Sequence, residues 1–367
     1  MIAEQVDALR LAETANAFGL GVGVFLRNQG SVLYSTLCDR ARHDAEIVAL
    51  AARARPGAPP HFSLLCAVHY LLHRQRDAPL ARWYATLCDS PLPPEQAWTP
   101  FRDFCLARAP EIVALMRERT VQSTAAERAA YVLPLLAHVA GIAGEPLGLI
   151  EIGASAGVLL AFDDYRYEFG DFSIGPQDSP VRIRSRWAGP AAAAPRRMPA
   201  IGARIGLDLH PVDLSDPDAR AWILGSIFPE WRQQHANLQA AFDLVARRGI
   251  RTLAGDALDN LDEALAQVPD PLCILHSHCL YYWPAAAKQA LDDRLRGIGR
   301  RRTVHRIGIE QPDGYAARAR DAARAGRPAA DESIFPLATC TLYRGGEAQS
   351  RTLARCGQYG DFVDWLA

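Results

Sequence analysis

The sequence predicts an α/β protein in which a mostly parallel sheet follows an all-helical N-terminal domain. Two observations predict it. Residues 1–145 carry apolar side chains at helical spacing, and from residue 147 onward short apolar runs alternate with amphipathic stretches. Strands that alternate with helices along a chain form parallel β-α-β units, with helices on both faces of the sheet. We therefore expect a helical domain over 1–145 and a sheet domain over 146–367.

The N-terminal helices are predicted from this apolar spacing and from the proline-rich breaks between them. Helical segments are expected at 31–54, 61–74, 79–88 and 124–144. Ser31 is the expected N-cap of the first segment. The closing glycines of the last segment suit a helix end, and Pro134 suits a kink within it.

Five short apolar runs are the expected strands of the sheet. They lie at 147–152, 203–209, 250–254, 272–277 and 303–309. Residues 338–356 then add two strand-like runs joined at Gly345-Gly346, which is the pattern of a hairpin. Five parallel strands followed by a closing hairpin predict a Rossmann-like sheet of the class I methyltransferase type.

Residues 163–202 lie outside this plan, between the first strand and the second. We interpret them as a β-hairpin-like insertion followed by a flexible loop. Within it, alternation along one strand would put Arg182, Arg184 and Arg186 on the same face. A solvated strand face explains these arginines as well as a binding role does.

The overall composition restricts the classes of partner. A formal net charge of −1 gives no basic field for nucleic acid. No stretch approaches the ~20 apolar residues of a membrane span, and the first residues lack the basic start and apolar core of a signal peptide. The 8 cysteines are scattered, as free thiols in a reducing compartment are. We expect a cytoplasmic protein with a small-molecule substrate and no nucleic-acid or membrane partner, and the oligomeric state stays open.

The stretch LIEIGASAGVLL, residues 149–160, fits two kinds of site. Its G-x-S-x-G core, residues 153–157, matches the nucleophile elbow of serine hydrolases. It also matches a glycine-rich loop between a strand and a helix, which holds a nucleotide-like cofactor. An elbow follows a central strand, whereas the strand at 147–152 is the first of its sheet. We favour the cofactor loop.

The hydrolase alternative also needs an acid and a histidine downstream of Ser155. Asp256 with His276 or His278 would supply them, but both histidines end a neighbouring strand and do not belong to a late loop. The elbow motif alone has many false matches. The serine hydrolase therefore remains the less favoured alternative.

The cofactor interpretation gives each residue of this loop a role. Gly153 allows the tight turn, and Gly157 lets the following helix pack close to the strand. The N-terminus of that helix would favour negative charge. Ser155 replaces the usual middle glycine, and its hydroxyl would bond the cofactor carboxylate or the backbone. Glu151, at the end of a buried strand, needs partners, and in S-adenosylmethionine (SAM) enzymes this acid binds loop N–H groups or the cofactor's ammonium.

Two acidic residues that follow the next strands complete the predicted cofactor site. Asp208 would accept the ribose hydroxyls, although the insertion lengthens the usual spacing of ~20 residues, and Asp213 is the fallback. A turn or cap role is the alternative for Asp208. Asp256 would bind the adenine amino group, and the alternative is an N-cap of a helix at 257–267.

The stretch HSHCLYYWP follows the fourth expected strand, where such folds place the reacting group. His276 and His278 would act as a base and its orienting partner. Three aromatic residues would form the wall of a substrate pocket: Tyr281, Tyr282 and Trp283. The histidine pair is also half of a metal site, but it lacks a partnered cluster, so no metal is expected. The alternative is one buried, hydrogen-bonded histidine and one surface histidine.

Five ordered motifs resemble those of an uncharacterised bacterial family known only as a domain of unknown function. They are LIEIGASAGVLL, DDYRYEF, GLDLHPVDLSDPDARAWI, AGDALDNL and LHSHCLYYWP, and SVLYSTLC and SLLCAVHYLL nearer the N-terminus extend the likeness over nearly the whole chain. The resemblance implies a class I SAM-methyltransferase fold behind a helical region. The family commonly shows Q-T-N-E and then Arg before the first strand. Here residues 122–125 read QSTA, and Arg128 is retained as a candidate for the cofactor carboxylate, with a surface arginine as the alternative.

These observations together predict a SAM-dependent methyltransferase that acts on an unidentified small molecule. The helical region would then cover the site and form much of the acceptor pocket. Methyl transfer depends mainly on in-line positioning, so it does not require a dedicated catalytic residue. The main alternative is a non-catalytic ligand-binding or assembly protein on the same fold, because a fold alone does not establish activity.

Overall fold

The computed structural model describes residues 6–21, 26, 29–312 and 335–367. Its contacts divide the chain into two compact units, and each is described by itself. Unit 1 holds the described residues of Met1–Ser123 and Pro217–His235. Unit 2 holds the described residues of Thr124–Asp216, Ala236–Asp313 and Glu332–Ala367. The division does not fall at residue 145, because the segment that becomes helix α8 belongs to the unit that contains the sheet.

Unit 1 is helical throughout its described part. Its elements are α1 (Ala8–Asn16), η1 (Ala17–Gly21), α3 (Val32–Ala41), α4 (Ala45–Ala51), α5 (Pro60–Arg74), η2 (Pro79–Trp83), η3 (Pro94–Gln96), α6 (Trp98–Ala107), α7 (Ala109–Glu118) and α9 (Pro217–Leu224). The expected helix at 31–54 is two helices, because Asp44 accepts the N–H groups of Glu46 and Ile47 and so starts α4. The expected helix at 79–88 is only the short 3-10 helix η2.

Ser31 stands at the N-cap position of α3 but makes no side-chain cap hydrogen bond. The cap comes from Glu230, whose carboxylate accepts the Leu33 N–H at 2.7 Å and the Ser31 hydroxyl at 2.9 Å. A carboxylate at a helix N-terminus accepts a hydrogen bond from an otherwise unpaired N–H group and interacts favourably with the positive end of the helix dipole. The segment 217–235 therefore supplies the N-terminal cap of a helix that lies far from it in the sequence.

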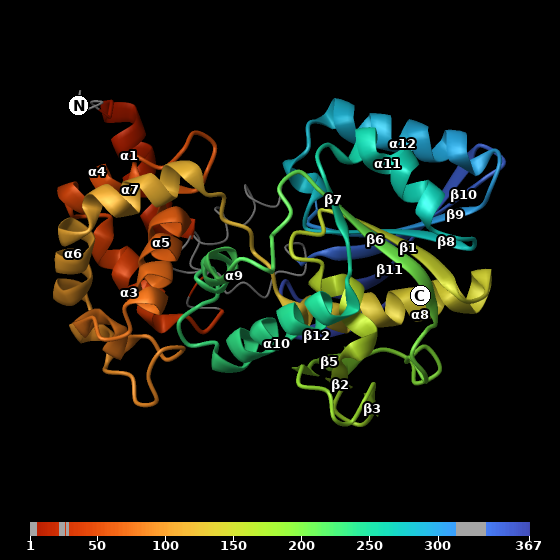
Figure 1. Ribbon diagram of the computed structural model, residues 1–367, viewed down its shortest axis with the longest axis horizontal. Coiled ribbons are helices and arrows are strands. Elements are labelled where there is room, and N and C mark those ends of the chain that lie inside the picture. The colour runs from red at the N-terminus through yellow and green to blue at the C-terminus, as the bar shows by residue number, and fades with distance from the viewer. Residues whose placement is uncertain (1–5, 22–25, 27–28, 313–334) are drawn as a thin grey trace. The chain divides into compact units, whose positions relative to one another are not determined.

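Unit 2 is a mixed α/β unit built on a large, mostly parallel sheet of nine strands (Figure 1). Its helices are η4 (Ala126–Arg128), α8 (Ala129–Ala143), η5 (Val158–Asp164), most of α10 (Arg232–Arg248), α11 (Ala257–Gln267), η6 (Leu280–Tyr282) and α12 (Ala285–Gly299). The strands of the large sheet are β1 (Leu147–Ile152), β5 (Arg186–Ala188), β6 (Ile201–Asp208), β7 (Thr252–Ala254), β8 (Leu272–Ser277), β9 (Val304–Glu310), β10 (Leu337–Arg344), β11 (Glu347–Cys356) and β12 (Phe362–Trp365).

The strand order is β5-β12-β11-β10-β9-β8-β1-β6-β7. The five expected strands, β7, β6, β1, β8 and β9, are all parallel to one another. The expected hairpin follows as β10 and β11, which pair antiparallel to each other, and β10 also pairs antiparallel with β9. The predictions of a mostly parallel sheet and of a hairpin are confirmed.

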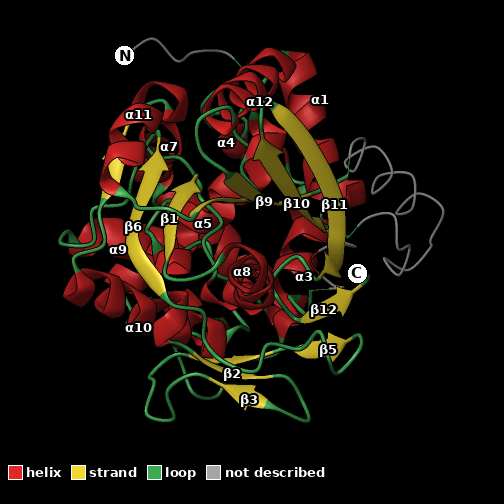
Figure 2. Cartoon of the chain, turned by 90° about the vertical axis from the view of Figure 1, so that its right-hand side faces the viewer, coloured by secondary structure: helices red, strands yellow, loops and turns green. Residues whose placement is uncertain are grey.

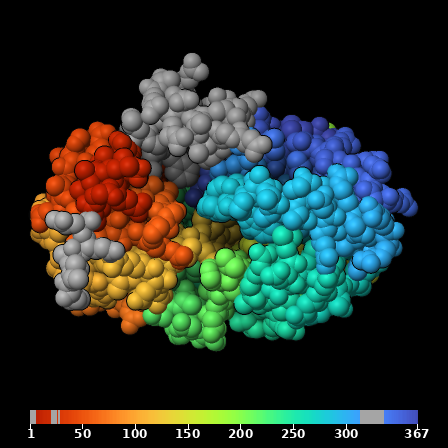
Figure 3. All heavy atoms as spheres, turned by 90° about the horizontal axis from the view of Figure 1, so that it is seen from above, coloured from red at the N-terminus to blue at the C-terminus, as the bar shows by residue number. Residues whose placement is uncertain are grey.

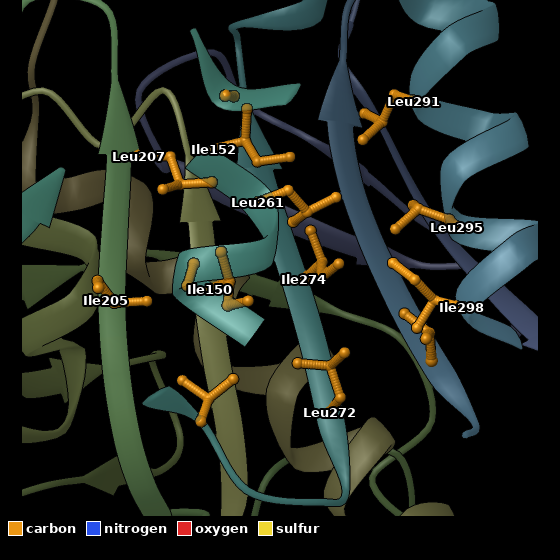
Figure 4. Close-up of a cluster of buried hydrophobic side chains, with 14 of the residues drawn as sticks. Ile150, Ile152, Ile205, Leu207, Leu261, Leu272, Ile274, Leu291, Leu295 and Ile298 are labelled. Carbon is orange, nitrogen blue, oxygen red and sulfur yellow. The ribbon is translucent and has the colours of Figure 1, made fainter. Parts of the chain in front are cut away.

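Helices cover both faces of this sheet. α11 and α12 lie on one face and α8 lies on the other (Figures 1 and 2). In the space-filling view, α11 and α12 form the neighbouring teal and light-blue surfaces (Figure 3). The core beneath them joins strand residues to helix residues (Figure 4), among them Ile150, Ile152, Ile205, Leu207, Leu261, Leu272, Ile274, Leu291, Leu295 and Ile298. Burial of this apolar surface fixes the register of the central strands.

The insertion at 163–202 contributes to two sheets. β2 (Arg166–Glu168), β3 (Ser173–Ile174) and β4 (Arg182–Arg184) form a separate three-stranded sheet. Arg182 and Arg184 are exposed there beside Glu168. Arg186 instead begins β5, which pairs with β12 at the edge of the large sheet, and its guanidinium lies over the Phe362 ring. The prediction that the three arginines share one strand face is wrong, because the chain passes from one sheet to the other at Ser185.

The helix expected directly after the glycine-rich loop is the 3-10 helix η5, seven residues long. The side chains that follow it account for this difference. Tyr165 donates its hydroxyl hydrogen to the Val158 carbonyl, and Tyr167 donates to the Phe162 carbonyl, both at 2.6 Å. These carbonyl groups are thereby satisfied without a longer α-helix. The loop therefore lacks the long helix dipole that the sequence led us to expect.

Candidate functional site

The candidate site lies at the edge of the sheet where the parallel strands β6, β1, β8 and β9 have their carboxyl ends. Ligands of open α/β sheets bind at this edge, next to the point where the strand order reverses. Here that point lies between β1 and β8. Each strand has a polar residue at its last or next-to-last position, in spatial order Asp208, Glu151, His276 and Glu310.

The glycine-rich loop after β1 turns sharply at Gly153, where φ is 76°. A side chain at this position would collide with the loop after β8, because an added Cβ would stand 2.7 Å from Cys279 Cβ and closer still to its Sγ. Gly157 also has a positive φ, 70°, and precedes η5. The two loops beside the switch point therefore touch, and only glycine fits the contact at 153.

Ser155 adopts the left-handed backbone conformation at φ 52° within this loop. Its N–H donates to Asp208 Oδ2 at 2.8 Å, and its hydroxyl lies 2.9 Å from the Thr124 hydroxyl. The other Asp208 oxygen, Oδ1, accepts the His210 N–H at 2.8 Å. Asp208 therefore has the turn-stabilising role that the sequence offered as its alternative, and it ties the loop after β1 to the end of β6.

Glu151 is 2% exposed, on the sheet face opposite Ile150 and Ile152. Its Oε2 atom is buried and has no hydrogen-bond partner among the described residues. Burial, and then the nearby Asp208 carboxylate, raise the pKa of Glu151 well above its usual value. Buried polar atoms without a partner are rare in folded proteins, and each one points to a missing ligand or water.

His276 is oriented by a carboxylate from the neighbouring strand. Its Nδ1 lies 2.8 Å from Glu310 Oε1, and the same oxygen accepts the N–H groups of Cys279 and Leu280. Burial alone would raise the pKa of Glu310, but the hydrogen bond and charge of His276 together with these N–H groups lower it. Gly308 makes room for the imidazole, since an added Cβ would stand 2.6 Å from His276 Cε1.

His278 lies apart from this pair, in the loop that follows β8. Its own N–H donates to the Ile309 carbonyl at 2.9 Å, and its φ is 52°. Burial, and then the charge of Arg128, lower the pKa of His278 well below its usual value. The described partner of His276 is Glu310, so the two histidines are not arranged as a base and its orienting group. The Nε2 atoms of both rings are buried without a described hydrogen-bond partner.

Arg128 precedes α8 and is buried, with 7% of its surface exposed. Its Nε donates to the Gln358 carbonyl at 3.3 Å, and its guanidinium lies 5.5 Å from the centre of the Tyr359 ring. A buried cation requires an anion or several acceptors. Its neighbour Glu127 is also buried, and burial raises the pKa of that carboxyl to about 7.

The remaining predicted residues cap turns or helices, are exposed, or pack in the core. Asp256 is exposed and caps α11 by accepting the Leu258 N–H at 2.8 Å, and Asp213 accepts the Ser215 N–H within its own turn. Tyr281 and Tyr282 are 42% and 74% exposed. Trp283 instead packs against the hydrophobic core beneath α11 and α12.

Sequence reasoning did not single out Glu310, Thr124 or Glu127. Glu310 had a usable signal, because it directly follows the strand predicted at 303–309. Thr124 and Glu127 had none, because their positions depend on how the segment before α8 packs. Among the described residues, no group of three or more His, Cys, Asp or Glu could hold a metal ion, and no helix is long and apolar enough to cross a membrane.

The fold and this edge define a mixed α/β protein with a polar site at the carboxyl ends of its parallel strands. The chain belongs to the bacterial family described as "Uncharacterized protein conserved in bacteria (DUF2332)", whose family model matches residues 23–365. This is the family that the sequence motifs resemble. No curated protein and no solved structure matches the chain.

Proposed function

We propose that this protein is a SAM-dependent methyltransferase that acts on a small molecule. The strand order β7-β6-β1-β8-β9 supports the proposal, because it follows the 3-2-1-4-5 plan of doubly wound nucleotide-binding sheets. The glycine-rich loop stands at the switch point of this plan. We propose that it is a class I methyltransferase.

The observation that carries the proposal is the buried, unpartnered Oε2 of Glu151. It lies two residues before the tight turn at Gly153, on the strand that leads into the cofactor loop. The ammonium group of SAM would give this oxygen its missing hydrogen bond and would offset the cost of a buried charge. When bound, SAM supplies an activated methyl group on a sulfonium.

Other residues would hold the rest of the cofactor. The buried Arg128 would bind its carboxylate. Asp208 would act mainly through the loop, because both of its oxygens already accept N–H groups. Asp256 is proposed for the adenine amino group through Oδ2, since Oδ1 serves the cap of α11.

One feature speaks against the serine hydrolase. Two of the three candidate triad partners are engaged elsewhere, since Asp256 caps a helix and His276 bonds Glu310. Labelling of Ser155 by a fluorophosphonate would favour the hydrolase.

The test is calorimetric titration of the full chain with S-adenosylhomocysteine. We expect micromolar binding by the wild type and a loss of at least about 10-fold in Glu151→Gln, because an amide cannot balance the ligand's ammonium charge. Glu347→Gln, which changes an exposed carboxylate on β11 in the same way, is the matched control and should leave binding unchanged. Absence of binding by the wild type would contradict the proposal, and binding without methyl transfer to any acceptor would favour a non-catalytic ligand-binding protein.

A further inference from the structure

Ser155 stands in the middle of the glycine-rich loop in a backbone conformation that glycine adopts more easily. Its φ is 52°, in the left-handed region, where a Cβ atom adds a conformational cost. The residues two positions before and after it, Gly153 and Gly157, have positive φ angles as well. A residue other than glycine that is kept in this conformation points to a role for its side chain.

Three hydrogen bonds of Ser155 indicate what that role is. Its N–H donates to Asp208 Oδ2 at 2.8 Å, and its carbonyl accepts the Val212 N–H at 3.2 Å. Glycine would make both of these bonds, because they use the backbone. The third bond needs the side chain, since it joins the Ser155 hydroxyl to the Thr124 hydroxyl at 2.9 Å. Among these three bonds, the contact with Thr124 is therefore what a serine provides and a glycine does not.

Thr124 lies at the start of the segment that leads into α8. It is the first residue of unit 2, and it is 6% exposed. Arg128 follows four residues later at the end of η4, which packs against η5, the helix after the glycine-rich loop. The hydroxyl bond therefore ties the segment that carries Arg128 to the loop that follows Glu151. These are the two side chains proposed above for the carboxylate and the ammonium of the cofactor.

We propose that Thr124 is a positioning residue of the cofactor site, which holds Ser155, and with it the glycine-rich loop, in the conformation that binds the ligand. This inference rests on the proposed function. Thr124 acts through Ser155 and is assigned no contact with the cofactor. An amino acid group carries its two charges close together, so the groups that bind them need fixed positions as well. A loop that is already ordered loses less conformational entropy on binding, which raises its affinity for the ligand.

The test is calorimetric titration of the full chain and of two Thr124 variants with S-adenosylhomocysteine. Thr124→Val has nearly the same shape without the hydroxyl, and we expect it to bind at least about 5-fold more weakly, which is the effect of losing one hydrogen bond. Thr124→Ser keeps the hydroxyl and should stay within about 2-fold of the wild type. Thr341→Val is the matched control. The Thr341 hydroxyl lies 2.7 Å from the Ser350 hydroxyl, between β10 and β11, so this variant loses the same kind of bond and should keep its affinity.

Ser155→Ala tests the same bond from its other side and should also weaken binding by at least about 5-fold. In the Ser155→Ala background, Thr124→Val should change the affinity by less than about 2-fold, because the bond is already lost. Thermal unfolding of every variant separates a loss of stability from a loss of affinity. Unchanged affinity in Thr124→Val, an equal loss in Thr341→Val, or independent losses that multiply in the double variant would overturn this inference. Failure of the wild type to bind S-adenosylhomocysteine would instead overturn the proposed function.

Discussion

Gly153 and Cys279 pack against each other, so the loop that leaves β1 and the loop that leaves β8 are in direct contact. The contact stands at the switch point of the sheet, where the strand order turns from β1 to β8. It leaves no volume for a side chain at position 153, and the positive φ there adds a conformational cost for any other residue.

Gly153→Ala should therefore lower the free energy of unfolding by more than about 2 kcal/mol, from steric overlap added to backbone strain. Gly57→Ala is the matched control, because Gly57 has a φ of 79° but nothing within 4 Å of an added Cβ. It should cost only about 1 kcal/mol. Urea unfolding measures both, and equal losses would contradict the contact.

Asp208→Ala should destabilise the glycine-rich loop, because it leaves the N–H groups of Ser155 and His210 without their acceptor. We expect a loss of about 1–3 kcal/mol, and a smaller loss for Asp208→Asn, which keeps an acceptor oxygen. Hydrogen exchange at the Ser155 amide reports the same bond locally. Unchanged protection of that amide in Asp208→Ala would show that the bond does not hold the loop.

Glu230→Ala should weaken the start of α3 more than Ser31→Ala does. The carboxylate accepts both the Leu33 N–H and the Ser31 hydroxyl, whereas Ser31 itself caps nothing. We expect about 1–2 kcal/mol for Glu230→Ala, the usual cost of losing a helix cap. Amide exchange at Leu33 distinguishes the two variants, and the reverse ranking would restore Ser31 as the cap.

Glu127 should make stability depend on pH. Burial raises its folded-state pKa to about 7, from a value of about 4.3 in the unfolded chain. The folded state therefore holds a proton that the unfolded state releases, and the associated stability is present below pH ~4.3 and lost as pH rises through about 7. Glu127→Gln keeps an acceptor for Asn237 and cannot ionise. Its advantage over the wild type should grow to about 3.7 kcal/mol between these pH values and stay flat above them. A constant difference at every pH would contradict this.

Local patterns predicted the sheet well because its strands are continuous apolar runs. The strands at 147–152 and 272–277 have the predicted bounds, and the helix after Asp256 spans 257–267 as predicted from its cap. The helix expected after Gly157 was wrong because Tyr165 and Tyr167, which lie beyond it, satisfy its carbonyl groups. Such capping by later side chains has no periodic signal in a sequence.

The positions of Glu151, Asp208 and His276 near strand ends were predictable from the sequence, but their hydrogen-bond partners were not. The partner of His276 was not, because Glu310 lies 34 residues away in the sequence and reaches it only through the pairing of β8 with β9. The prediction that Arg186 shares a strand face with Arg182 and Arg184 was wrong for a related reason. The alternating run that contains them is divided between two sheets.

The most direct test of the central claim is the number of protons released when S-adenosylhomocysteine binds. Burial raises the pKa of Glu151 well above its usual value, and an ammonium bound beside it would lower that pKa again, so ligand binding should release protons from this carboxyl. Calorimetry at pH 7 in phosphate and in Tris, whose ionisation enthalpies differ, measures this release. The account predicts that the wild type releases more protons per bound ligand than Glu151→Gln does. Binding with the same proton count in both proteins would show that Glu151 does not receive the ammonium.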